Sequence, residues 1–251
     1  MMRDAFKTLA LVILVALATS LWFIVVVPWF PKARPKVDRN QQVADDFHFL
    51  WYFNKETQKT TWLGIPTQQN PMDLWVTQEI LFDTKPDFVV ECGSYLGGSA
   101  AAWATVLAQV NPAGRIISID IVDRMDNARK LPICKERVDF LVGSSTDPAI
   151  VSEVARRVRG KKIFVLLDSL HTEEYVLKEL RTYSPMVQVG GYIEVQDSNI
   201  NGHPIRPYGF GPGPYEAIQD FLKENKDFVP DKDREHLIFT FCPNGFLKRV
   251  K

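Results

Sequence analysis

The chain has 251 residues, and its 30 lysine and arginine residues balance 30 aspartate and glutamate residues, so the formal net charge is zero. A neutral chain lacks the basic surface that binds nucleic acid, and we therefore expect no nucleic-acid partner. The three cysteines, Cys92, Cys134 and Cys242, are too few and too widely spaced for a disulfide framework or a zinc site. They are expected to be buried thiols in a reducing compartment.

The first 31 residues are predicted to form a transmembrane anchor. No charged residue lies between Lys7 and Lys32, and residues 9–30 are almost wholly aliphatic or aromatic. A helix of this length spans about 33 Å, against roughly 30 Å for the hydrocarbon core of a bilayer. A cleavable signal peptide is the alternative, because Ala16 to Ala18 resembles a cleavage site, but the apolar run continues where a mature protein would begin.

More basic residues follow the span, within residues 32–39, than precede it, at Arg3 and Lys7. The positive-inside rule therefore favours a single-pass membrane protein with a cytoplasmic C-terminal domain. Residues 32–40 are predicted to be a charged, proline-bearing linker. The aromatic-rich residues 41–85 are expected to form helices over the edge of a sheet or over a cleft, and residues 86–251 to form one domain.

From residue 86 onward, strand and helix patterns alternate. Strands are predicted over residues 88–92, 115–120, 138–142, 162–168, 191–195, 236–241 and 246–250, and helices over residues 99–110, 148–158, 173–186 and 214–224. Apolar runs such as Ile163–Leu167 are typical of strands covered by helices on both faces. The predicted fold class is α/β, a doubly wound, mostly parallel seven-stranded sheet that ends in an antiparallel hairpin with Asn244 and Gly245 in its turn.

The strand at residues 88–92 runs into a glycine-rich turn, and a helix-forming run follows. Backbone N–H groups and the helix dipole at such a turn bind the negative charge of a ligand. Tyr95 stands two residues after Gly93, where a dinucleotide fingerprint requires glycine, so NAD is disfavoured. Asp120 ends the next strand and can accept the ribose hydroxyls of a nucleoside. Both features fit S-adenosylmethionine (SAM), and close helix packing is the alternative explanation of the glycines.

Polar residues follow two later strands, Asp168 after one and Gln196 with Asp197 after the next. Adjacent parallel strands end about 4.8 Å apart, so Asp168 and Asp197 could share a divalent ion. Two carboxylates with the Gln196 amide suit Mg²⁺ better than zinc. His171 lies on the same loop as Asp168 and could accept a proton from a substrate hydroxyl. The alternatives are helix capping by the aspartates and a structural role for His171.

Four motifs, at residues 73–80, 91–99, 167–171 and 197–204, resemble those of the cephalosporin hydroxylase/rhamnosyl O-methyltransferase family of SAM-dependent enzymes. The resemblance covers roughly residues 60 to 250, and the layout is more distantly similar to the catechol-type, Mg²⁺-dependent O-methyltransferases. It implies the class I methyltransferase form of the Rossmann-like fold. The cofactor-binding residues that it implies are Glu91, Gly93, Tyr95, Gly97, Ser99, Asp120 and Ser145.

Within that set, the resemblance implies that Gly93, Tyr95 and Ser99 hold the methionine end of SAM, that Asp120 holds the ribose and that Ser145 contacts the adenine. These roles follow the order of the motifs along the chain.

The resemblance also puts Asp168, Gln196 and Asp197 at metal-ligand positions, and His171 where the catechol enzymes have their general-base lysine. A carboxylate usually precedes the aspartate that matches Asp197, so the amide of Gln196 departs from the family pattern and is expected to weaken Mg²⁺ binding. The predicted catalytic residues are His171 and Asp168.

The predicted function is methyl transfer from SAM to a hydroxyl of a sugar, glycolipid or related small molecule by a membrane-anchored O-methyltransferase, with Mg²⁺ assistance. The anchor and the rhamnosyl branch of the family favour a lipid-linked glycan as the acceptor. The alternative is a membrane-tethered SAM-binding protein with impaired catalysis, of which Gln196 would be the first sign. Hydroxylase chemistry is disfavoured because the sequence has no recognisable set of two histidines and one carboxylate for iron. The oligomeric state is left open, a homo-oligomer included.

Overall fold

The computed structural model describes residues 39–205 and 211–251. Contacts within the chain divide it into two units, residues 1–43 and 44–251, and the second unit contains the sheet. The predicted anchor, and all but the last two residues of the predicted linker, lie outside the described residues. Within residues 39–205 and 211–251, no helix combines the length and the apolar character that a bilayer crossing requires.

The segment before the sheet contains helices, as predicted, and a small antiparallel strand pair that the sequence does not predict. The elements are α2 (Arg39–Phe53), the 3₁₀ helix η3 (Glu56–Lys59), β1 (Thr61–Trp62), β2 (Ile65–Pro66) and α3 (Pro71–Thr84). The start of α3 is fixed by Asn70, whose side chain accepts a hydrogen bond from the N–H of Met72, and by Pro71 in the first turn.

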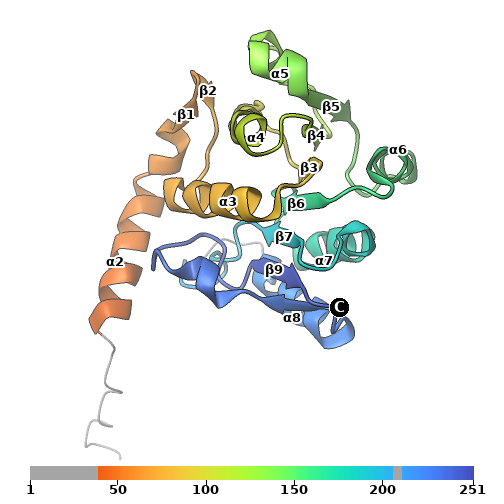
Figure 1. Ribbon diagram of the computed structural model, residues 1–251. Helices are drawn as coiled ribbons and strands as arrows, with labels where there is room; N and C mark the ends of the chain where they lie inside the picture. Colours follow the sequence, from red (N-terminus) through yellow and green to blue (C-terminus); the bar gives the residue numbers. More distant parts are fainter. Residues whose placement is uncertain (1–38, 206–210) are drawn as a thin grey trace, which may run out of the picture. The chain divides into compact units, whose positions relative to one another are not determined.

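Seven strands form the main sheet: β3 (Phe88–Cys92), β4 (Arg115–Asp120), β5 (Val138–Val142), β6 (Ile163–Leu167), β7 (Tyr192–Val195), β8 (Phe228–Pro230) and β9 (Phe246–Arg249). Their order is β5-β4-β3-β6-β7-β9-β8. Strands β3 to β7 are parallel, and β9 runs antiparallel to both β7 and β8 (Figure 1). The prediction of a mostly parallel, seven-stranded sheet is therefore confirmed.

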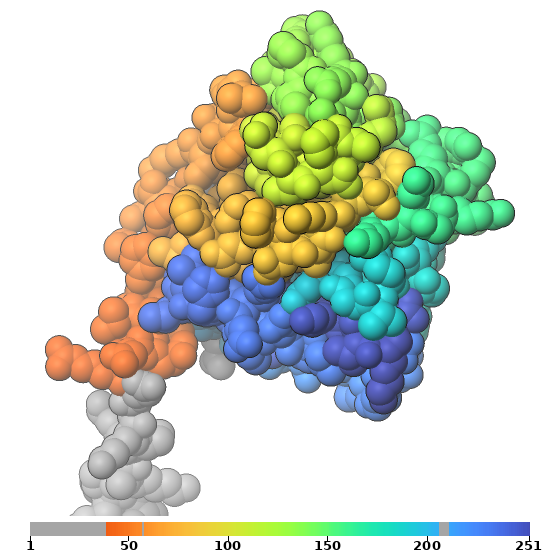
Figure 2. Space-filling view, viewed as in Figure 1, coloured from red at the N-terminus to blue at the C-terminus, as the bar shows by residue number. Residues whose placement is uncertain are grey.

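Helices cover both faces of this sheet (Figure 1). They are α3, α4 (Gly98–Val110), α5 (Pro132–Arg137), α6 (Pro148–Val158), α7 (Glu173–Tyr183) and α8 (Pro214–Glu224), and short 3₁₀ helices η4 (Ala128–Lys130), η5 (Ser184–Met186) and η6 (Lys232–Glu235) lie between the elements. Successive strand residues point to opposite faces, so Val89 joins the core under α3 and α4, and Val90 the core under α6, α7 and α8. Figure 2 shows α3 and α4 next to each other at the surface in this view.

The predicted C-terminal hairpin is wrong in its first strand. Residues 236–241 form no strand, and β9 pairs with β8 and β7 instead. The aromatic rings of this segment pack on α2, with the centroids of Phe239 and Phe241 at 4.8 and 5.1 Å from that of His48. Asn244, at φ +60°, does lie in the turn before β9. The apolar character of residues 236–241 therefore reflects packing on a helix and not pairing in the sheet.

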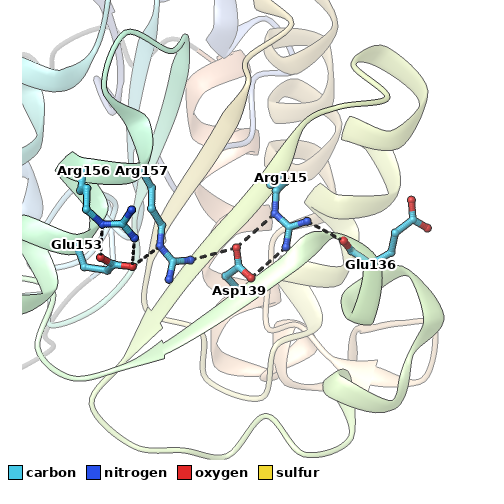
Figure 3. Close-up of polar contacts among 6 residues, drawn as sticks. All are labelled: Arg115, Glu136, Asp139, Glu153, Arg156 and Arg157. Carbon is cyan, nitrogen blue, oxygen red and sulfur yellow. Dashed lines mark hydrogen bonds and ion pairs between the residues drawn. The ribbon is translucent and has the colours of Figure 1, made fainter.

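A network of ion pairs joins β4 and the edge strand β5 to α6 (Figure 3). Asp139 of β5 contacts Arg115 of β4 at 3.0 Å and Arg157 of α6 at 3.2 Å. Arg157 also contacts Glu153, one turn earlier in α6, at 2.6 Å. These groups are partly exposed, so they align β4, β5 and α6 and add less to stability than the apolar core does.

Candidate active site

A cavity of about 520 Å³ opens at the carboxyl ends of the parallel strands. Its wall contains one residue from the end of each of these strands, namely Gly93 (β3), Asp120 (β4), Gly143 (β5), Asp168 (β6) and Asp197 (β7). In doubly wound sheets, ligands bind at this edge, and the volume is in the range of small-molecule sites. Gly93, Asp120, Asp168 and Asp197, which the sequence analysis singled out at strand ends, therefore meet in one place.

The turn between β3 and α4 allows an unusually close approach of two backbones. Gly93 has φ +102°, and a Cβ at this position would lie 1.9 Å from the carbonyl oxygen of Asp168. Tyr95, at φ +47°, donates its backbone N–H to Asp120 Oδ2 at 2.8 Å. Ser99, in the first turn of α4, lines the cavity with them. The turn thus leaves open space at a helix N-terminus, as anion binding requires.

Two residues of the predicted cofactor set lie behind the cavity and not in its wall. A Cβ at Gly97 would be 2.6 Å from that of Ala128, so this glycine allows α4 to pack closely. Glu91 is buried on the α4 face of the sheet and accepts hydrogen bonds from Trp103 Nε1 at 3.0 Å and from the Ser118 hydroxyl. Burial raises the pKa of Glu91 to about 7. Both residues support the turn from behind.

Asp120 and Ser145 both line the cavity. The carboxylate of Asp120 accepts backbone hydrogen bonds from Tyr95 and, at 2.9 Å, from Val122, which fix its orientation. Each carboxylate oxygen has a further lone pair, so Asp120 can also accept from ribose hydroxyls. Ser145, on the loop after β5, donates its hydroxyl to Glu179 of α7.

Asp168, His171 and Asp197 come together at the β6 and β7 side of the cavity. One possible ligand atom from each lies within 4.8 Å of the others, and no other such group is found among the residues that the structure describes. His171 Nε2 is 3.3 Å from Asp168 Oδ1 and 3.3 Å from Asp197 Oδ2. This donor set fits a divalent cation, and its carboxylate oxygens are the ligand type that Mg²⁺ prefers.

Gln196 does not join this cluster, which corrects its assignment as a metal ligand. The residue is buried, and its side-chain amide donates a hydrogen bond to Glu194 Oε1 within the sheet. It is absent from the wall of the cavity. The third polar group beside the two aspartates is therefore the imidazole of His171.

The two carboxylates control the charge of His171. Burial lowers the pKa of this imidazole, but the charges of Asp197 and Asp168 outweigh burial and raise the pKa to about 9. The imidazole therefore carries a proton at neutral pH and serves as the counter-ion of the pair. A divalent cation held by both carboxylates would cancel this effect and favour the neutral imidazole, which is the form that accepts a proton.

Several residues of the site escape sequence reasoning. Thr67 and Gln68 line the cavity from the segment before α3, and their neighbour Gln69 donates to Asp168 Oδ2 at 2.9 Å. A polar run before a helix is more simply explained as capping, so it gives little signal. Other unpredicted residues of the wall are Ile119, Ile121, Arg124, Ser169, Leu170 and Tyr175.

A doubly wound sheet closed by an antiparallel pair, with a glycine turn after β3 and an acid at the end of β4, is a fold that this chain shares with solved methyltransferase structures. A solved structure of CmcI with Mg and SAM is 18% identical, has a TM-score of 0.60 and covers 77% of this chain and 78% of that chain. The O-methyltransferase TomG from Streptomyces achromogenes with SAM is 16% identical, has a TM-score of 0.50 and covers 81% and 86%. Both show that the fold is shared.

Residues 54–250 match the family described as Rhamnosyl O-methyltransferase/CmcI. Rhamnosyl O-methyltransferases of Mycobacterium tuberculosis and Mycobacterium bovis are 40% identical over 214 residues, which cover 82% of this chain and 85% of each relative. The Mycobacterium leprae protein of that name is 39% identical over 213 residues, with 82% and 90% covered. The chain belongs to the rhamnosyl O-methyltransferase/CmcI family and is a SAM-dependent O-methyltransferase.

Proposed function

We propose that this enzyme methylates a hydroxyl of a sugar carried by a lipid, with a Mg²⁺ ion at its active site. The observation that carries the proposal is the meeting of Gly93, Asp120 and the cluster of Asp168, His171 and Asp197 in one cavity. The names of the mycobacterial relatives support a rhamnosyl acceptor, and the CmcI structure with Mg and SAM supports the metal.

In this proposal, the turn at Gly93 and the carboxylate of Asp120 hold SAM, while Asp168 and Asp197 hold the metal. Mg²⁺ at this position would lower the pKa of an acceptor hydroxyl beside it. His171 would accept the hydroxyl proton at Nε2, the ring nitrogen that faces the cluster. The acceptor oxygen would bond to the methyl carbon of SAM as the bond from sulfur to that carbon breaks, and S-adenosylhomocysteine would be the second product. The protein contributes chiefly alignment and control of charge.

The test measures transfer of labelled methyl from SAM by the full-length, detergent-solubilised protein. Rhamnosyl glycolipids and the matching free sugars are offered as acceptors, with and without Mg²⁺. Asp168→Ala and His171→Ala are expected to lose at least about 100-fold in kcat, a size typical of lost general-base catalysis. Asp126→Ala is the matched control, because Asp126 is an exposed carboxylate with 89% of its side-chain surface accessible.

Three results would contradict parts of this proposal. Unchanged turnover in Asp168→Ala and His171→Ala would remove their roles. Equal activity on free and lipid-linked sugars would contradict the claim that the acceptor sugar is carried by a lipid. Binding of SAM with no methylated product from any acceptor would favour the alternative, a SAM-binding protein with impaired catalysis.

Anchoring of the enzyme in a membrane is a second part of the proposal, and it rests on the apolar sequence of residues 9–30. The basic residues that follow favour a cytoplasmic active site. Intact mass of the protein extracted from membranes distinguishes an anchor, which retains these residues, from a cleaved signal peptide. Protease added outside right-side-out vesicles should leave the catalytic domain intact. Digestion of this domain would contradict its cytoplasmic orientation.

A further inference from the structure

Two serines in the cavity wall share one buried carboxylate. Ser145 follows β5 and Ser169 follows β6, and both hydroxyls donate to Glu179 Oε1 of α7, the Ser169 contact being 2.7 Å. Glu179 is fully buried, and its second oxygen, Oε2, has no hydrogen-bond partner. No positive side chain contacts this carboxylate among the hydrogen bonds and ion pairs of the described residues. The two hydroxyls that donate to Glu179 thus both belong to the cavity wall.

Glu179 fixes the direction of a chain of hydroxyls. The Tyr175 hydroxyl lies 3.1 Å from Ser145 Oγ and 2.8 Å from Ser144 Oγ. A hydroxyl has a single proton to donate, and that of Ser145 is directed at Glu179. Tyr175 must therefore donate to Ser145, and Ser144 to Tyr175. Once these protons are engaged, the hydroxyls can offer only lone pairs to a ligand in the cavity, whose wall includes all three.

The protonation state of Glu179 does not alter this direction. Burial raises the pKa of its carboxyl to about 7, although the hydrogen bonds from Ser145 and Ser169 lower it. In the neutral form, the proton belongs on Oε2, the oxygen without a partner, so Oε1 continues to accept from both serines.

Strand order indicates which part of a ligand meets this wall. From β7 to β5, the strands follow the order β7-β6-β3-β4-β5. The groups at their carboxyl ends are, in the same direction, the cluster of Asp197, Asp168 and His171 at β7 and β6, the turn at Gly93, Asp120, and the loop with Ser144 and Ser145. With the reactive carbon at the cluster and the ribose at Asp120, the nucleobase meets Ser144 and Ser145. We infer that Glu179 is a positioning residue that makes this wall a hydrogen-bond acceptor and so selects the amino group of adenine over a 6-oxo purine. The inference rests on the proposed function.

The test compares S-adenosylhomocysteine with S-inosylhomocysteine, in which a carbonyl oxygen replaces the amino group of adenine. Both dissociation constants are measured by calorimetry on the full-length protein. We expect the wild type to favour S-adenosylhomocysteine, and Glu179→Leu to reduce this preference about tenfold, because leucine cannot accept the Ser145 proton and leaves that hydroxyl free to donate to a 6-oxo group. Glu174→Leu is the matched control, since Glu174 is exposed on the same helix, and it should keep the wild-type ratio.

The ratio of the two constants separates this role from a merely structural one, which would weaken both ligands equally. An unchanged ratio in folded Glu179→Leu would overturn the inference while leaving the proposed function intact. Failure of the wild type to bind S-adenosylhomocysteine would overturn both.

Ser145→Ala provides an independent test if Glu179→Leu does not fold. It removes the acceptor itself and should reduce the preference to a similar extent, and a preserved preference would overturn the inference. In the double variant, Glu179→Leu should add no further loss, because its effect passes through Ser145.

Discussion

The side-chain amide of Gln69 donates a 2.9 Å hydrogen bond to Asp168 Oδ2, joining the segment before α3 to the end of β6 across 99 positions of sequence. Gln69 is 4% exposed, and its own oxygen has no partner. The amide therefore has one contact, which orients a carboxylate of the candidate metal site. Groups that hydrogen-bond to a metal ligand in this way fix its orientation, and their loss commonly lowers the affinity for the metal.

Gln69→Leu should weaken the response of the enzyme to Mg²⁺. Loss of the orienting hydrogen bond is expected to raise the Mg²⁺ concentration for half-maximal activity about tenfold. The affinity for S-adenosylhomocysteine should change less than twofold, because Gln69 is not part of the cavity wall. Metal titrations of activity, with the exposed Gln58→Leu as control, check this. An identical Mg²⁺ response in Gln69→Leu and wild type would contradict it.

Mg²⁺ binding should release a proton from His171. The charges of Asp197 and Asp168 hold the pKa of this imidazole at about 9 despite burial, so it is protonated at pH 8. A metal that engages both carboxylates removes that support, and about one proton should leave. The enthalpy of Mg²⁺ binding should then depend on the ionisation enthalpy of the buffer. His171→Gln should abolish the dependence, and its absence in the wild type would refute the coupling.

Glu91→Gln should change how stability depends on pH. Burial raises the pKa of Glu91 from 4.5 to about 7. The native state therefore holds this proton more tightly than the unfolded state, and the associated stability is fully present below pH 4.5 and is lost as pH rises through 7. The shift corresponds to roughly 3 kcal/mol. Because glutamine does not titrate, the variant should gain about that much relative to wild type between pH 4.5 and 8. Urea unfolding of both proteins at these pH values measures the difference, and a constant difference would contradict the prediction.

Gly93→Ala should abolish cofactor binding and destabilise the fold. The added Cβ would meet the carbonyl oxygen of Asp168 at 1.9 Å, and φ +102° is unfavourable for alanine. Gly64 is the matched control, since it has φ +82° but no atom within 4 Å of an added Cβ. Gly64→Ala should cost about 1 kcal/mol from conformation alone and leave cofactor affinity unchanged. Calorimetric binding and thermal unfolding compare the two, and equal effects would show that the close backbone approach is unimportant.

The strands of the parallel sheet are predictable because each is a short apolar run buried on both faces, as Ile163–Leu167 illustrates. The first strand of the predicted hairpin fails for a related reason. Phe239 and Phe241 are as apolar as the residues of a buried strand, but their rings pack on His48, which lies nearly 200 positions earlier in the chain. Local pattern does not distinguish burial under a helix from burial in a sheet.

The candidate site divides in the same way. Asp120, Asp168 and Asp197 stand at strand ends, so sheet geometry alone brings them together. Gln69 and Glu179 do not stand at strand ends, and each is joined to the site by hydrogen bonds. A glutamate in the middle of a helix usually faces solvent, so the sequence gives no sign of the role of Glu179. Gln196 shows the converse, because it stands at a strand end but turns toward Glu194.

Since Gln69 reaches Asp168 from upstream of the sheet, the boundary at residue 86 suggested by the strand pattern would make a poor place to cut the gene. A fragment that starts there would retain all seven strands of the main sheet yet lack Thr67 and Gln68 from the pocket and the amide that aligns Asp168. Truncated versions of this enzyme should therefore keep the segment before α3, and chimaeras should take that segment and the sheet from the same parent protein.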